Sequence, residues 1–94
     1  MGELTPGQVL VGGRYVIGRP LGEGRFSTVY AARDRKLERP CALKVLSESA
    51  TAVHRASLSR EAAAGKMVRH ESLCRVLDSG VIEDGRDFLS LERL

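Results

Sequence analysis

Hydrophobic and polar residues alternate along much of the chain, at the spacing of β-strands that bury one face. From Arg14 onward the pattern is strand-like, and a second such segment covers residues 26–32. A third segment, residues 41–46, is apolar on both faces apart from Lys44, which is typical of a central strand. Two further strands are predicted near residues 75–82 and 87–91.

Between the third and fourth strands the periodicity becomes helical. Ser49 or Thr51 can cap a helix that we expect to run to about Arg69. Spacings of three, four and three residues put four positions on one face of this helix: Leu58, Glu61, Gly65 and Val68. A carboxylate on that face is unusual, and the simplest interpretation is a glutamate tolerated at the helix edge.

The order of these elements predicts an α+β fold, a five-stranded antiparallel sheet with one main helix. Residues 1–13 are interpreted as an N-terminal leader that lies against the edge of a domain formed by residues 14–94. Asp84-Gly85 predicts a tight hairpin between the last two strands. The length of 94 residues suits one small domain.

Composition excludes several classes of protein. The net charge is +3, but the basic residues are dispersed and the aromatics are two Tyr and two Phe, so nucleic-acid binding is not expected. No apolar run reaches the roughly 18 residues of a membrane helix. The N-terminus has no signal-peptide pattern, and we expect a cytoplasmic location and no membrane segment in this chain.

The two cysteines and three aspartates predict no chemistry. Cys41 and Cys74 lie outside any Cys-x-x-Cys spacing and are interpreted as small buried residues in a reducing compartment. Asp78, Asp84 and Asp87 are interpreted as surface residues in turns or at strand ends. No metal site is predicted from these residues.

The candidate for chemistry is the glycine-rich segment Gly22-Glu23-Gly24-Arg25-Phe26-Ser27. Glycines let a backbone approach phosphate oxygens closely. A dinucleotide fold would require a helix after this loop, whereas Thr28-Val29-Tyr30 are β-formers. A Walker loop would require Gly-Lys followed by Ser or Thr, which is absent. A strand on each side, Val29, and the downstream run Cys41-Ala42-Leu43-Lys44 fit a protein kinase loop.

From about Gly13 to Leu94 the chain therefore resembles the N-terminal lobe of a protein kinase, and is most similar to bacterial serine/threonine kinases of the eukaryotic-like kind. The resemblance rests on the order of the glycine loop, Ala42-x-Lys44, Arg60-Glu61 on the helix, and a last strand that leads into the hinge. It implies that the chain binds ATP, with Mg in the intact enzyme.

The resemblance also implies a role for each site residue. Lys44 would contact the α- and β-phosphates and be oriented by Glu61, which would explain the carboxylate on an apolar face. Leu91 would control access behind the adenine, and backbone groups near Glu92 and Leu94 would bind its edge. The adenine roof would consist of Leu21, Val29 and Ala42. The loop residues over the phosphates would be Gly22, Glu23, Gly24, Arg25, Phe26 and Ser27, with Phe26 at the tip excluding water.

Three features depart from the family pattern. Ser27 stands at the third glycine position of the loop. Gly65 falls where the family places a bulky apolar residue, so we expect a packing gap and a loosely held helix. The catalytic loop with its base aspartate and the Asp-Phe-Gly metal site have no match in these residues, so we expect no catalytic residue and no activity from residues 1–94 alone.

Two functions from different classes remain open from the sequence. The leading interpretation is the ATP-binding lobe of a serine/threonine kinase, whose partners in the intact enzyme would be a protein substrate and the second lobe. The alternative is a truncated, kinase-like interaction module without catalysis.

Overall fold

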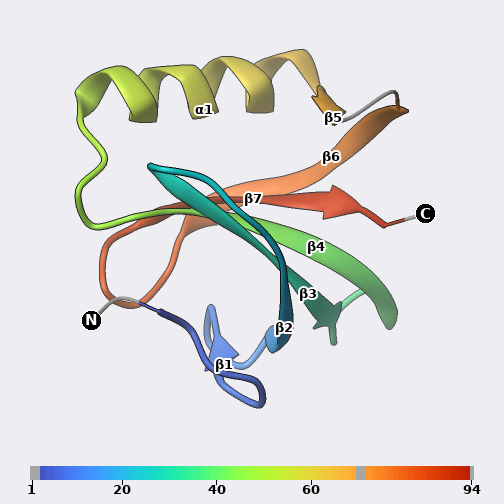
Figure 1. Ribbon diagram of the computed structural model, residues 1–94. Coiled ribbons are helices and arrows are strands. Elements are labelled where there is room, and N and C mark those ends of the chain that lie inside the picture. Colours follow the sequence, from blue (N-terminus) through green and yellow to red (C-terminus); the bar gives the residue numbers. More distant parts are fainter. Residues whose placement is uncertain (1–2, 70–71, 94) are drawn as a thin grey trace.

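Five long antiparallel strands form a curled sheet with a helix lying across one of its faces (Figure 1). The computed structural model describes residues 3–69 and 72–93. Its elements are β1 (Val9–Leu10), β2 (Tyr15–Glu23), β3 (Ser27–Asp34), β4 (Arg39–Leu46), α1 (Ala52–Ala64), β5 (Lys66–Arg69), β6 (Ser72–Val81) and β7 (Asp87–Glu92). The strand order is β1-β2-β3-β4-β7-β6-β5, and each neighbouring pair is antiparallel.

The predicted α+β class is confirmed. The five expected strands correspond to β2, β3, β4, β6 and β7, and two short strands, β1 and β5, extend the two edges. The hairpin predicted at Asp84-Gly85 joins β6 to β7. Gly85 adopts a φ of 94° there and donates its N–H to the Ile82 carbonyl at 2.9 Å.

Alternation along β4 divides the apolar residues between the two faces of the sheet. Cys41, Leu43 and Val45 point into a core on the face away from α1. Ala42 and Leu46 point the other way, toward α1, and Lys44 shares their parity. Because both faces of β4 are covered, it is the central strand that its sequence predicts. Cys41 is buried and free, as expected, whereas the side chain of Cys74 lies outside the described part.

The leader packs beneath the sheet and pairs with its edge. Leu4 and Leu10 are buried in the core on the face away from α1, and the Leu4 N–H donates to the Tyr30 hydroxyl at 3.2 Å. Glu83, in the β6–β7 turn, accepts hydrogen bonds from the backbone of residues 11 and 12 at 2.8 and 3.1 Å. These two N–H donors lower the pKa of Glu83. The segment therefore belongs to the folded unit.

A cluster of charges ties the turn before β2 to strands β3 and β6. Arg14 donates through Nε and Nη2 to the two carboxylate oxygens of Asp34, at 3.1 and 2.9 Å, and through Nη1 to Asp78. The Asp34 side chain is fully buried and also accepts the N–H groups of Lys36 and Leu37. The bond from Arg14 is the main cause of the lowered pKa of Asp34. Asp78 is 43% exposed, as expected of a surface residue, but it lies within β6 rather than at a strand end or in a turn, and it binds Arg14.

The helix is shorter than its sequence suggests. Thr51 is the N-cap as predicted, but α1 ends at Ala64 and Gly65 adopts a left-handed C-cap with φ 70°. The Gly65 N–H donates to the carbonyls of Glu61 and Ala62, both at 3.1 Å. The expected extension to Arg69 is wrong, because the chain reverses at Gly65 and continues as β5.

The expectation that Gly65 lies within the helix is also wrong, because it is the C-cap of α1. Glycine is placed there for its backbone conformation, and a β-carbon added to it would meet no atom within 4 Å. The residue therefore lies in open space past the last turn of the helix, rather than in its interior.

Replacing Asp34 by Asn should lower the free energy of unfolding by about 3 kcal/mol, the lower end for breaking a buried ion pair, because Arg14 keeps Asp78. Urea unfolding would measure it. Asp84→Asn, which removes a local pair with Arg86 in the β6–β7 turn, should cost less than about 1 kcal/mol. Since the folded pKa of Asp34 is lowered, its contribution is present above its unfolded pKa and is lost as pH falls. If the difference in stability between the parent chain and Asp34→Asn were the same at low and at neutral pH, this expectation would be contradicted.

Replacing Gly65 by Ala should destabilise the chain by about 1 kcal/mol, because a β-carbon disfavours the left-handed conformation. Gly65→Asn should cost less, because Asn tolerates that conformation better. The surrounding space is open, so a steric explanation would predict no difference between the variants. Thermal unfolding of both would decide between the two explanations.

Candidate functional site

The centre of the candidate site is an ion pair between the sheet and the helix. Lys44 lies on β4, between Val29 of β3 and Leu89 of β7 in the sheet register. Its Nζ donates to Oε1 of Glu61 on α1 at 3.0 Å, and the two side chains are 20 and 25% exposed. The carboxylate on the apolar face of the helix thus has a cationic partner. The interpretation of Glu61 as merely tolerated at the helix edge is wrong.

The glycine-rich loop connects β2 to β3 as a strand–loop–strand unit. Gly22 and Glu23 still pair with Val29 and Thr28, and the chain reverses over residues 24–26. The Gly24 N–H donates to the Ser27 carbonyl at 2.7 Å. A β-carbon at Gly24 would lie 3.3 Å from that carbonyl oxygen, which is tighter than ordinary contact. Because a strand follows this loop, the dinucleotide alternative is excluded.

The three residues of the predicted adenine roof and Leu91, the predicted access residue, gather on the helix side of the sheet. Ala42 and Leu91 are buried there and lie opposite each other in the β4–β7 register. Leu21 and Val29 are partly buried and pack against the same cluster. All four residues therefore share one apolar face with Lys44.

Of the two predicted hinge residues, Glu92 and Leu94, the structure describes only Glu92. Glu92 ends β7, and its carboxylate lies 3.4 Å from Nη2 of Arg39. That side chain is therefore engaged with the neighbouring strand β4. Leu94 lies outside the described residues.

The tip of the loop contacts a residue that sequence reasoning missed. The Phe26 ring stacks on the imidazole of His54, with centroids 3.8 Å apart and planes inclined by 29°. His54 also accepts the Thr51 N–H through Nδ1 at 2.9 Å, at the third helical position. The sequence signal was its capping position three residues after Thr51, although the usual residues there are Glu and Gln. No sequence pattern indicated the ring contact with the loop.

A cavity of about 100 Å³ separates the loop from the ion pair. Residues of the loop, β4 and α1 line it together: Phe26, Ser27, Lys44, Leu46, His54, Ser57, Leu58 and Glu61. The loop therefore lies directly over the lysine that the sequence singled out.

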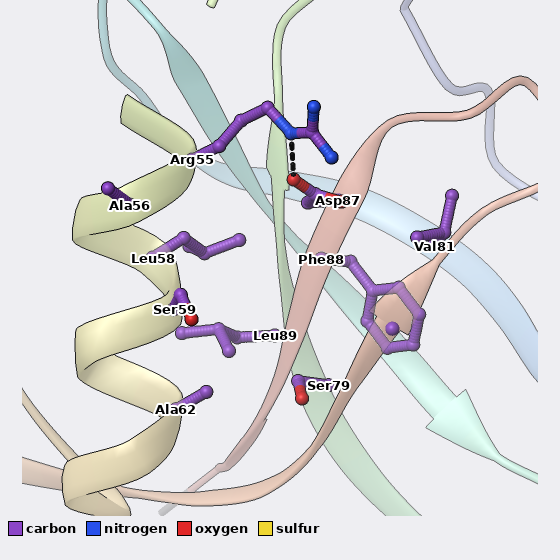
Figure 2. Close-up of a pocket in the computed structure, with 11 residues that line it drawn as sticks. Arg55, Ala56, Leu58, Ser59, Ala62, Ser79, Val81, Asp87, Phe88 and Leu89 are labelled. Carbon is purple, nitrogen blue, oxygen red and sulfur yellow. Dashed lines mark hydrogen bonds and ion pairs between the residues drawn. The ribbon is translucent and has the colours of Figure 1, made fainter. Parts of the chain in front are cut away.

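A larger cavity of about 430 Å³ lies between α1 and strands β6 and β7 (Figure 2). Leu58 and Leu89 line it, and Nε of Arg55 donates to Asp87 at 2.7 Å on its rim. The prediction that Asp87 is a simple surface residue is wrong, because its side chain is 18% exposed and ion-paired. This cavity contains neither Lys44 nor any residue of the glycine-rich loop, and so it does not belong to the candidate site.

The groups gathered at the candidate site can be compared with those that a bound nucleotide would require. The apolar face, the lysine and the glycine loop suit adenine and phosphate groups. The residues present therefore fit a nucleotide. Among residues 3–69 and 72–93, no three His, Cys, Asp or Glu side chains converge as metal ligands. In the same described ranges, no helix has the length and apolar character needed to span a bilayer.

Comparison with known proteins shows which family shares this sequence pattern. Residues 15–90 match the family model described as protein tyrosine and serine/threonine kinase. A probable serine/threonine-protein kinase pknA2 of Bifidobacterium longum is 36% identical over 98% of this chain and 12% of its own length. Aurora kinase B of Danio rerio is 42% identical over 81% of this chain and 24% of its own length.

A solved structure agrees in fold. The kinase domain of Mycobacterium tuberculosis PknI superposes with a TM-score of 0.70 at 24% identity, over 98% of this chain and 37% of that domain. The chain thus spans only a minor part of each relative. It belongs to the protein kinase family and corresponds to the N-terminal, ATP-binding lobe of that fold.

Proposed function

We propose that residues 14–94 hold the adenine and phosphate groups of ATP for a serine/threonine protein kinase. In the intact enzyme the γ-phosphoryl group would pass from Mg-ATP to a hydroxyl of a protein substrate, at a cytoplasmic location. The observation that carries the proposal is the 3.0 Å pair between Lys44 and Glu61 beneath the glycine-rich loop. Serine/threonine kinases among the relatives support the same conclusion.

Each part of the site has a physical task in this proposal. The apolar side chains of Leu21, Val29 and Ala42 would cover the adenine ring and exclude water from it. Lys44 would place its ammonium against the phosphates, and Glu61 would fix the direction of that side chain. Residues 22–27 would contribute backbone N–H groups, which bind phosphate oxygens without a side chain in the way.

The pair formed by Lys44 and Glu61 favours a lobe descended from an active enzyme over a non-catalytic interaction module. An ion pair this poorly exposed holds two long side chains in one geometry, which costs conformational entropy. Phosphate binding supplies a reason for that arrangement. A docking module would not require it.

The catalytic step needs groups that residues 1–94 do not contain. Phosphoryl transfer depends on metal ions that neutralise the developing charge and on an aspartate that orients the acceptor hydroxyl. The described carboxylates offer no metal cluster, and Glu61 is engaged by Lys44. The role of this lobe is therefore to bind and orient the nucleotide.

Replacing Lys44 by Met should weaken ATP binding by the full chain about 10- to 100-fold, because it removes a charge-assisted hydrogen bond to phosphate. Adenosine has no phosphates, so its affinity should change little. Lys36→Met is the matched control, since Lys36 is exposed in the β3–β4 turn and should keep parental affinity for both ligands. Calorimetric titration would measure the affinity of each variant for ATP and for adenosine. Equal loss of ATP affinity in the two variants would contradict the proposed role of Lys44.

A pure polypeptide of residues 1–94 should show no Mg-ATP-dependent phosphorylation of itself or of a general protein substrate. The reason is that it lacks the base aspartate and the metal ligands. Transfer of labelled γ-phosphate, detected by autoradiography, is the measurement. Incorporation that persists in the purified polypeptide and disappears in its Lys44→Met variant would overturn this expectation.

A further inference from the structure

The tip of the glycine-rich loop is joined to the start of α1 by an aromatic stack. The Phe26 and His54 rings lie 3.8 Å apart between centroids, inclined by 29°. The guanidinium of Arg25 lies on the same phenyl ring, 5.3 Å from its centroid. The loop tip is thus held by side-chain contacts, in addition to the bond from the Ser47 N–H to the Phe26 carbonyl at 2.8 Å.

The partner ring is itself held in place by the helix cap. The Thr51 N–H donates to Nδ1 of His54 at 2.9 Å, which fixes the imidazole against the first turn of α1. His54, Leu58 and Glu61 follow one another at spacings of four and three residues, and so they lie on one face of the helix. One face of α1 therefore contacts the loop through His54 and Lys44 through Glu61.

The loop in this position closes the space that phosphates would need. The cavity between the loop and Lys44 measures only about 100 Å³, and Phe26 and Ser27 of the loop line it together with Lys44. The Gly24 N–H is also used within the loop, where it donates to the Ser27 carbonyl at 2.7 Å. Both observations describe a loop that must lift before its backbone can hold a phosphate.

We propose that His54 is a positioning residue whose stack with Phe26 holds the glycine-rich loop down over Lys44 and Glu61, so that nucleotide entry requires this stack to open. The proposal rests on the proposed ATP-binding function. The stack keeps part of the population closed, and a closed fraction reduces both the association rate and the apparent affinity for the nucleotide. His54 therefore controls access to the site without contacting the nucleotide.

Two substitutions separate the ring contact from the helix cap. His54→Gln keeps a side-chain acceptor at the third helical position, where Gln is a usual capping residue, but removes the ring. His54→Phe keeps an aromatic ring against Phe26 and removes the acceptor. If His54 only caps α1, His54→Phe should change the behaviour of the loop more than His54→Gln does. If the stack holds the loop down, His54→Gln should open the loop and His54→Phe should not.

The first measurement uses no nucleotide. Trypsin cleaves after arginine, and the bond after Arg25 lies at the loop tip. In the nucleotide-free full chain, His54→Gln should speed cleavage at this bond about 2- to 10-fold, the range expected for one aromatic pair. His54→Phe should retain the parental rate. Mass spectrometry of the early fragments identifies this cleavage among those at other arginines.

The second measurement is stopped-flow binding of a fluorescent ATP analogue to the same three proteins. The association rate should rise about 2- to 10-fold in His54→Gln and stay parental in His54→Phe. Parental cleavage after Arg25 in His54→Gln would overturn the inference, whether or not the analogue binds. Faster cleavage with an unchanged association rate would also overturn it, because the stack would then not limit entry. Faster cleavage in a chain that binds no analogue in any form would refute the proposed function, and with it the role of the stack in entry.

Discussion

The arrangement of this lobe depends on one ion pair that bridges its two layers. Lys44 extends from the most enclosed strand of the sheet, and Glu61 from the helix above it, and they meet at 3.0 Å. An ammonium on a mostly apolar face is costly unless a carboxylate lies beside it. The pair therefore constrains where α1 lies over β4, and apolar residues of one cluster lie beside it. The loop, the sheet and the helix become parts of one site around this pair, since Phe26, Leu46 and Leu58 line one cavity with it.

The opposite face of the sheet has a different task. The core there is closed by the leader through Leu4 and Leu10, and its end is tied by the buried Arg14–Asp34 pair. Tyr15 and Phe88 pack edge to face in the same core, with ring centroids 5.5 Å apart. These interactions stiffen the sheet from below without contacting the site. The glycine-rich loop lies at the opposite side from these contacts, which involve none of its residues.

The two cavities beside α1 illustrate why volume alone does not locate a site. The larger one, between α1 and β6–β7, is lined by Leu58 and Leu89 and contains no residue of the loop (Figure 2). The smaller one lies between the loop and Lys44, and the tip of the loop lines it. Its chemistry, more than its size, identifies it.

Local sequence determined most of the fold and most of the site. Alternation predicted the five long strands, glycine and β-formers predicted the loop between two strands, and the apolar run around Lys44 predicted a central strand. The end of α1 was missed, because periodicity continues past Gly65 whereas the helix stops at its left-handed φ of 70°. The spacing of Glu61 predicted which face of α1 it lies on, and a resemblance to kinases supplied its partner. Tertiary structure decided the rest: the contact of Phe26 with His54, the clamp from Arg14 to Asp78, and the packing of the leader. Each of these joins residues far apart in the chain, and their meeting depends on strand order and on the angle of α1, which no local pattern encodes.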